Sequence, residues 1–373
     1  MKNEIEKKLS KIADIWNYYI WEYRECNKYI KFTEEARTNY FGDILGYFND
    51  TFDVVFEHRE ANSLSDTFAN NISLLQTIYV HQDFIEELLE LFKCGINKGN
   101  LKKDDNYTIN RDLRNELIGH PFRKQKGKFI SSTVFSYHPE PGHLEYLRYH
   151  VDNDYKFESK SYEISEIVKR HYNFLVTYLD KILNQLKVIL LRFISNVEKL
   201  EKLVETLDFE TLLKVLTIKF ESLFGNKTYL YEKNILKSIY KKKNEHKRYK
   251  NVIDKFYSDL KSSLKESKSI IIDYYTEVKN NEPTITTKPV FKFVDMTNIK
   301  STSITKKVTE RSYHYELGKL SEKKNFDFHF RCMREVYDSN KEAAIELDNM
   351  KNNLYNDIEY YCSYYLLRKI IKN

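Results

Sequence analysis

Residues 107–123 read YTINRDLRNELIGHPFR, and the prediction of the fold starts from this stretch. Its apolar residues Leu113, Leu117 and Ile118 recur at the spacing of one helical face, while the charged residues fall on the other side. This pattern predicts a short amphipathic helix over about residues 109–119.

His120 is expected to stand where this helix ends. A residue that precedes proline is disfavoured in the α region, and Gly119 loosens the last turn. In an ideal helix, the separation between Arg114 and His120 corresponds to an angle of about 120° between the two side chains. We therefore expect the length of the arginine side chain and the end of the helix to bring both groups to one edge.

Residues 114–120, RNELIGH, resemble the signature of the HEPN superfamily, in which an arginine, usually followed by a polar residue, precedes a histidine by about four to six residues. The resemblance covers about residues 1–205 and implies a helical bundle that pairs two such helices, often with metal-independent ribonuclease activity. No family is recognised in residues 206–373.

The ribonuclease hypothesis assigns a role to each of four polar residues. His120 would take the proton of the ribose 2′-hydroxyl, and Arg114 would neutralise the phosphate with its forked donors. Asn115 would orient His120 or a partner chain, and Arg111, one helical turn before Arg114, would add a second phosphate contact. Cleavage would leave 2′,3′-cyclic phosphate and 5′-hydroxyl ends, with no cofactor and no metal.

A purely structural interpretation of the motif also stands. In that interpretation His120 caps its own helix, and Arg114 pairs with Asp112 or Glu116. Other chemistry is less favoured by the sequence: three histidines gather near residues 138–150, but their spacing matches no zinc motif. Nucleotide-binding glycine loops and the serine-hydrolase motif are missing from the sequence.

The composition favours a mainly α-helical protein. The chain has 373 residues, of which 31% are charged and 41% hydrophobic, with 9 Gly and 5 Pro. This length predicts two domains or one elaborated helical domain. The charged N-terminus, the lack of a long apolar run and four isolated cysteines predict a cytoplasmic protein without a membrane segment.

The N-terminal half reads as a helical bundle with a β insertion. Helical periodicity runs over residues 2–31 and 64–94, and β-branched and aromatic residues replace it over residues 128–158. The latter predict an inserted β-hairpin, with a further short strand possible over residues 155–162. Such a hairpin could act as a flap, as a substrate-recognition arm, or as a decoration of the fold.

A long helix is predicted over residues 164–203, because apolar residues step by three and four for five heptads. This face packs inside the bundle in one interpretation and forms a dimer seam in the other. A domain boundary is expected near residue 205, followed by a C-terminal helical region, residues 206–373, with an irregular loop over residues 280–310.

Residues 227–268 carry 13 Lys or Arg against 5 Asp or Glu, whereas the net charge of the whole chain is +6. Such a segment suits phosphate binding, with interleaved tyrosines available for base stacking. The residues predicted to bind RNA here are Lys241, Lys242, Lys243, Lys247 and Arg248. The alternative is that these residues form a solvated helix face that binds no ligand.

Two functions follow from these observations. The first is a metal-independent endoribonuclease that acts as a toxin or in anti-phage defence, with RNA as substrate, a homodimeric composite site and an antitoxin or sensor protein as a further partner. The second is a non-catalytic helical module that binds RNA, a nucleotide or a protein. The dimer is expected because the chain has a single motif, and two copies would supply two histidines and two arginines to one phosphate.

Overall fold

The computed structural model describes residues 1–21, 23–31, 40–57, 61–135, 140–224, 231–280 and 313–371. The chain divides into two compact units, one of residues 1–196 with 220–225 and the other of residues 197–219 with 226–373. Each unit is described by itself. The described residues are mainly helical, as predicted, and one small sheet lies in the first unit.

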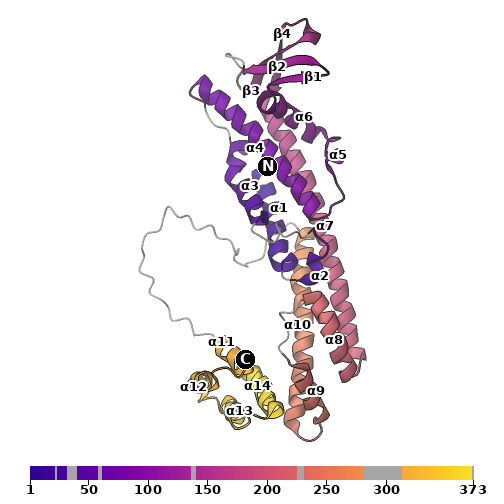
Figure 1. Ribbon diagram of the computed structural model, residues 1–373, viewed down its shortest axis with the longest axis vertical. Coiled ribbons are helices and arrows are strands. Elements are labelled where there is room, and N and C mark those ends of the chain that lie inside the picture. Colours follow the sequence, from indigo (N-terminus) through magenta and orange to yellow (C-terminus); the bar gives the residue numbers. More distant parts are fainter. Residues whose placement is uncertain are drawn as a thin grey trace. The chain divides into compact units, whose positions relative to one another are not determined.

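The first unit is a helical bundle with the sheet at one end (Figure 1). Its helices are α1 Lys2–Ile15, α2 Arg24–Asn27, α3 Tyr40–Phe56, α4 Leu64–Leu91, α5 Lys98–Leu101, α6 Asp105–Arg114 and the N-terminal part of α7 Ile164–Thr206. The predicted helix over residues 2–31 is interrupted: a π-helical turn, Trp16–Ile20, follows α1, and Tyr23 is extended before α2. The rings of Trp16 and Tyr23 stack on Phe41 and Phe193, which fixes this irregular segment against the bundle.

The β insertion is a four-stranded antiparallel sheet, larger than the predicted hairpin. Its strands are β1 Phe122–Gln125, β2 Lys128–Phe135, β3 His143–His150 and β4 Phe157–Glu163, in that spatial order. The strand that the sequence pattern did not predict is β1, which is short and charged. Lys126 and Gly127, with φ values of 51° and 80°, form the tight turn that pairs β1 with β2.

A hydrophobic core joins this sheet to the helices. Leu113 and Leu117, on and just after α6, pack with Leu144 and Tyr146 of β3 and with Ile167 of α7. The apolar residues of the motif stretch therefore face the core, as their spacing predicted. Arg111, Arg114 and Asn115 of the same stretch line the candidate site, whereas Asn110 is buried and donates to the carbonyl oxygen of Ile167 at 2.8 Å.

The second unit holds the C-terminal end of α7, most of α8 Phe209–Phe224, and six further helices. These are α9 Lys233–Lys241, α10 Lys247–Asn280, α11 His314–Ser321, α12 Phe326–Tyr337, α13 Lys341–Asn352 and α14 Asp357–Ile371. The irregular loop predicted over residues 280–310 lies, apart from its first residue, outside the described part of the chain. Within the described residues, no helix has the length and apolar character needed to cross a membrane.

Candidate functional site

The Arg–His motif lines a pocket of about 540 Å³ in the first unit. Polar side chains from α4, α5 and α6 surround it, together with the turn that ends at His120. Its lining residues are Tyr79, Lys98, Lys102, Tyr107, Thr108, Arg111, Asp112, Arg114, Asn115 and His120. The pocket thus brings together the four motif residues that the sequence singled out.

The end of α6 is wider than the α-helix expected from the sequence. After Arg114 the chain makes a π-helical turn, Asn115–Gly119, and the backbone N–H of His120 donates to the carbonyl oxygen of Asn115 at 2.7 Å. This turn sets Gly119 directly above Arg114: a Cβ atom added to Gly119 would lie 2.5 Å from Nη1 of Arg114. The absence of a side chain at Gly119 therefore makes room for the guanidinium beside His120. A π turn of this kind is a frequent feature of functional sites.

Arg114 is held in place by neutral groups. Its Nε and Nη2 donate to Oε1 of Gln76 at 3.0 and 2.9 Å, and its Nη1 donates to Oδ1 of Asn115 at 3.2 Å. Its guanidinium carbon lies 4.0 Å from the centre of the Tyr79 ring. Gln76 and Tyr79 both come from α4, and neither was predicted as a site residue.

These contacts leave the charge of Arg114 without a carboxylate partner among the described residues. The ion pair with Asp112 or Glu116 that the sequence allowed is not formed. Instead, Glu116 accepts a hydrogen bond from Ser132 Oγ at 2.8 Å and pairs with Nε of Arg148 at 3.2 Å and Nη2 of Arg123 at 3.6 Å. A fixed, half-buried guanidinium with remaining N–H donors is suited to an anionic ligand.

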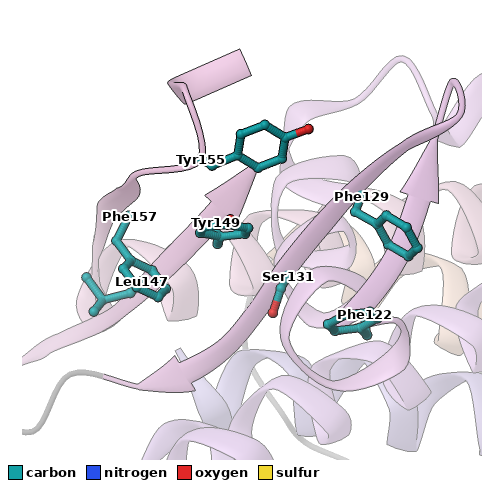
Figure 2. A pocket seen from close by; sticks show the side chains of 7 residues that line it. All are labelled: Phe122, Phe129, Ser131, Leu147, Tyr149, Tyr155 and Phe157. Carbon is teal, nitrogen blue, oxygen red and sulfur yellow. The ribbon is translucent and has the colours of Figure 1, made fainter. Parts of the chain in front are cut away.

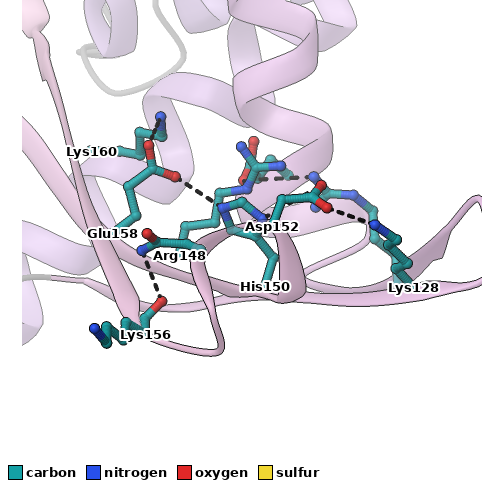
Figure 3. Close-up of polar contacts among 10 residues, drawn as sticks. Lys128, Arg148, His150, Asp152, Lys156, Glu158 and Lys160 are labelled. Atoms are coloured by element: carbon teal, nitrogen blue, oxygen red, sulfur yellow. Dashed lines mark hydrogen bonds and ion pairs between the residues drawn. The ribbon is translucent and has the colours of Figure 1, made fainter.

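The contacts of Glu116 also fasten the site to the sheet. The backbone N–H of Ser132 donates to the carbonyl oxygen of Pro121 at 2.9 Å, so β2 holds the segment that follows His120. Further along the same face of the sheet, His150 contacts Glu158 at 3.1 Å, and Lys160 pairs with Glu158 at 2.6 Å (Figure 3). The turn that carries His120 is held by β2 through Pro121 and by the contacts of Glu116.

Arg111 does not offer its charge to the pocket as predicted. It is buried, and its Nη2 and Nη1 pair with Asp83 at 2.7 Å and Glu86 at 3.5 Å. Burial acts to lower the pKa of Arg111, but the hydrogen bond that Arg111 donates to Asp83 and the nearby negative charges outweigh burial and raise the pKa. The guanidinium carbon lies 4.1 Å from the centre of the Tyr79 ring, so Arg111 supports the ring on which Arg114 also rests.

Two lysines of the pocket were not predicted as site residues. Lys98 and Lys102 lie on and just after α5, which a capping box between Asn97 and Asn100 initiates. Lys98 pairs with Glu86 at 3.4 Å, whereas Lys102 is exposed and has no ion pair within the part of the chain that the structure describes. Their polar loop gave no periodicity by which they could be placed near Arg114.

His120 stands at the rim of the pocket and is exposed. Its backbone follows the π turn with φ −140° and ψ 57°, so the helix ends here, as predicted. Among the described residues, no side chain donates to or accepts from its imidazole, although Arg123 Nη1 lies 3.4 Å from its carbonyl oxygen. The imidazole is therefore free to meet a ligand.

The basic segment lies in the second unit and forms two helices, α9 and the start of α10, joined by a turn. Lys241 and Lys247 are exposed, and Lys242 and Lys243 are half-buried, with Lys243 3.8 Å from the centre of the Tyr240 ring. Arg248 differs from them, because its Nη2 pairs with Glu346 at 2.6 Å and it also donates to Ser363.

The tyrosines of this segment, which the sequence offers for base stacking, contact other side chains of the second unit. Tyr240 stacks on Phe209 with ring centres 4.0 Å apart, and Tyr249 is buried and donates to Glu359. Tyr231 donates to Asp259 at 2.6 Å and packs against Tyr365. The aromatic rings in this region thus stabilise the fold of the second unit.

Within the described residues, no group of three His, Cys, Asp or Glu side chains is arranged to hold a metal ion. Comparison with known proteins finds no match for this chain among family models, curated proteins or solved structures. The assignment of function therefore depends on the geometry of the pocket and on the resemblance of residues 114–120 to the HEPN signature.

Proposed function

We propose that this chain is a metal-independent endoribonuclease of the HEPN type, with Arg114 and His120 as its catalytic residues. The proposal depends mainly on the contacts of the Arg114 guanidinium. Its guanidinium is fixed by amide oxygens of Gln76 and Asn115, lacks a carboxylate partner among the described residues, and lines the pocket at whose rim His120 stands. An RNA phosphate provides the negative charge that this arrangement leaves unmatched.

In the proposed reaction, His120 accepts the proton of a ribose 2′-hydroxyl. The 2′-oxygen then forms a bond to phosphorus, and the bond from phosphorus to the 5′-oxygen breaks. Arg114 compensates the charge that grows on the phosphate oxygens during this step, a contribution worth about 10²- to 10³-fold in rate for a single donor. The products carry 2′,3′-cyclic phosphate and 5′-hydroxyl ends, and the leaving oxygen receives its proton from an imidazolium.

Other residues position these two groups. Asn115 holds Arg114 through its side chain and His120 through its backbone carbonyl, so it acts as a positioning residue in this proposal. The exposed Lys102 adds positive charge to the same pocket. The pocket volume, about 540 Å³, lies in the range of sites that bind small molecules and is sufficient for one nucleotide.

A second copy of the chain would complete the site. One imidazole has to act both as base and as acid, because no other histidine among the described residues lines the pocket. A two-fold axis near His120 would bring in a second His120 and a second Arg114, which is the arrangement that the resemblance implies. The setting of a toxin or of anti-phage defence, and an antitoxin or sensor as further partner, also come from that resemblance.

A non-catalytic binding module is the alternative. The observation in its favour is that no side chain among the described residues orients the imidazole of His120. A general base is usually oriented by a further group, so the pocket of one chain by itself also suits plain phosphate binding.

End-group analysis separates these functions. Purified chain is incubated with a 5′-phosphorylated RNA in the presence of EDTA, and the products are treated with polynucleotide kinase and labelled ATP. New 5′ ends that accept label without prior phosphatase treatment, together with 2′,3′-cyclic phosphates, support the proposal. RNA that remains intact at pocket-saturating concentration supports the binding module, and cleavage that requires Mg²⁺ or Mn²⁺ contradicts the reaction class.

A further inference from the structure

The outward face of the sheet carries an unusual number of exposed aromatic rings. Phe122 is 67% exposed, Phe129 51%, Tyr155 58% and Phe157 61%. The opposite face of the same strands contributes Leu144 and Tyr146 to the core and holds the contacts of Glu116. Exposed apolar groups that lie together in this way mark binding surfaces, because leaving them in water has no benefit for folding.

The strand register places these rings in a row. Phe122 pairs with Ser131, Ser131 with Tyr149, and Tyr149 with Phe157, so one cross-strand row runs over all four strands. Figure 2 shows Phe122 and Phe129 on one side of Ser131 and the rings of Tyr149, Tyr155 and Phe157 on the other.

The small side chain of Ser131 leaves a hollow of about 470 Å³ between the two groups of rings. Phe122 and Tyr149 come from strands on either side of β2, which places them roughly 9–10 Å apart across Ser131. A planar ring system can enter this space with a polar edge toward the Ser131 hydroxyl.

Three lysines of β1 and of the adjoining turns place positive charge around the hollow. Lys124, Lys126 and Lys156 are exposed, and Nζ of Lys124 lies 4.7 Å from the centre of the Phe129 ring. The carboxylates of Glu145 and Glu163, which share the outward face, lie toward the other end of β3 and β4.

In the turns near the hollow, the carboxylate of Asp152 is bound by Lys128 at 2.8 Å, and Asp154 is exposed. A ligand with planar rings and a negatively charged backbone matches this combination of rings and lysines.

This face begins close to the candidate site along the chain. Phe122 follows His120 by two residues, and β1 begins at Phe122. Arg123, the next residue of β1, reaches the carbonyl oxygen of His120 with its Nη1 at 3.4 Å. A polynucleotide whose phosphate lies in the pocket can therefore continue directly onto the sheet.

We propose that the row Phe122, Ser131, Tyr149 and Phe157 binds single-stranded RNA by stacking its unpaired bases. The choice of RNA as the ligand rests on the proposed function of the neighbouring pocket. In duplex RNA the bases are already stacked and paired, so the row selects unpaired segments and presents the adjoining phosphate to Arg114 and His120.

Binding measurements on the full chain test the inference. The parent protein carries His120→Ala, so that RNA is not consumed. Fluorescence anisotropy is measured with a labelled 12-nucleotide oligouridine and with a blunt RNA duplex of the same length, at one fixed salt concentration. Phe122→Ala and Phe157→Ala each remove a ring, and Ser131→Leu fills the hollow while leaving the rings in place.

Two control variants match these changes. Ser159→Leu adds the same side chain on the outward face but outside the row, and Tyr355→Ala removes a ring that is 98% exposed in the second unit. Each row variant is expected to weaken oligouridine binding by about 5- to 150-fold, the effect of losing one stacked base. The oligouridine affinity of the two control variants, and the duplex affinity of the row variants, should stay within about twofold of the parent values.

Oligouridine affinity that is unchanged in the row variants would overturn the inference, and so would an equal loss for the duplex. A shift from dimer to monomer in sedimentation, with unchanged RNA affinity, would assign the face to contacts between protein chains instead. The two proposals fail separately. A wild-type chain that leaves RNA intact while the row variants lose binding overturns the ribonuclease proposal alone, and a chain that cleaves RNA while the row variants bind normally overturns the stacking row alone.

Discussion

Substitution of Gly119 by alanine probes the central geometry with a single added carbon. Gly119 does not have a positive φ, so alanine fits the backbone of the π turn, but its Cβ would lie 2.5 Å from Nη1 of Arg114. An ordinary contact distance of about 3.4 Å requires the guanidinium to move by about 0.9 Å. That movement stretches or breaks the hydrogen bond from Nη1 to Asn115, now 3.2 Å long.

The expected consequences for activity and stability differ. A misplacement of about 1 Å at a catalytic group costs about 10²-fold in rate, so kcat/KM for RNA cleavage should fall by about that factor. The free energy of unfolding should change by less than about 1 kcal/mol, since the displaced guanidinium can bond to water and alanine is favoured over glycine in a helix by about 0.5–1 kcal/mol.

The assay compares initial rates of cleavage of a fluorogenic RNA with urea unfolding followed by circular dichroism. Gly46→Ala is the matched control, because it lies within α3 of the same unit and an added Cβ has no neighbour within 4 Å. It should stabilise the protein slightly and leave cleavage unchanged. Cleavage by Gly119→Ala at the wild-type rate would refute the reasoning that the place of Arg114 beside His120 matters.

Three further predictions concern pH, the basic segment and assembly. Burial lowers the pKa of His171 to about 3 and lowers that of its neighbour His81, 3.1 Å away, well below the ordinary value, so both side chains are neutral in the folded protein. The unfolded chain takes up their protons below about pH 6.5, so the free energy of unfolding should fall as pH drops from 6.5 toward 4, by up to about 3 kcal/mol for His171. The urea midpoint of His171→Phe should fall less over the same pH range. Equal acid sensitivity of wild type and His171→Phe would show that other groups dominate. In the basic segment, joint substitution of Lys241, Lys242, Lys243 and Lys247 by glutamine should weaken RNA binding and flatten its salt dependence without loss of stability. Arg248→Gln should instead destabilise the second unit by about 3 kcal/mol, because it leaves Glu346 buried without its partner. An unchanged salt slope would show that these lysines only keep the surface soluble. For assembly, a mixture of equal amounts of wild-type and His120→Ala subunits should have about a quarter of the activity of the same total amount of wild type, because each site needs His120 from both chains. Activity in proportion to the wild-type fraction, together with a monomer by light scattering, would contradict a shared site.

The sequence predicted those features that follow from local patterns. The apolar spacing of Leu113 and Leu117 places one side of their helix in the core, and the residue before Pro121 ends that helix, as expected. The long helix predicted over residues 164–203 is observed as α7, Ile164–Thr206. Each of these features depends on neighbours within a few residues, which periodicity reports directly.

The parts that the sequence did not predict depend on contacts between distant segments. Gln76 and Tyr79 meet Arg114 from α4, and nothing in their own helix distinguishes them from other half-buried residues. The sequence predicted that Arg111 binds phosphate, because its ion-pair partners Asp83 and Glu86 lie far from it in the chain and could not be recognised.

Register and turn geometry account for the other differences. The aromatic row depends on the pairing of Phe122 with Ser131, and this pairing requires strand β1. The one sequence feature that indicates β1 is Gly127, the glycine of its two-residue turn. The π turn at Asn115–Gly119 has no sequence pattern of its own, and only the structure shows that the missing side chain at Gly119 leaves room for Arg114.

The most direct measurement is the rate of RNA cleavage by His120→Ala beside that of His143→Ala. Both histidines lie in the first unit near the sheet, but only His120 lines the pocket with Arg114. Loss of the general base should reduce the rate by at least about 10²-fold, and up to about 10⁴-fold, in His120→Ala, with an unchanged helical circular dichroism spectrum and a wild-type rate in His143→Ala. A His120→Ala protein that cleaves RNA as fast as the wild type would contradict the assignment of this pocket as a ribonuclease site.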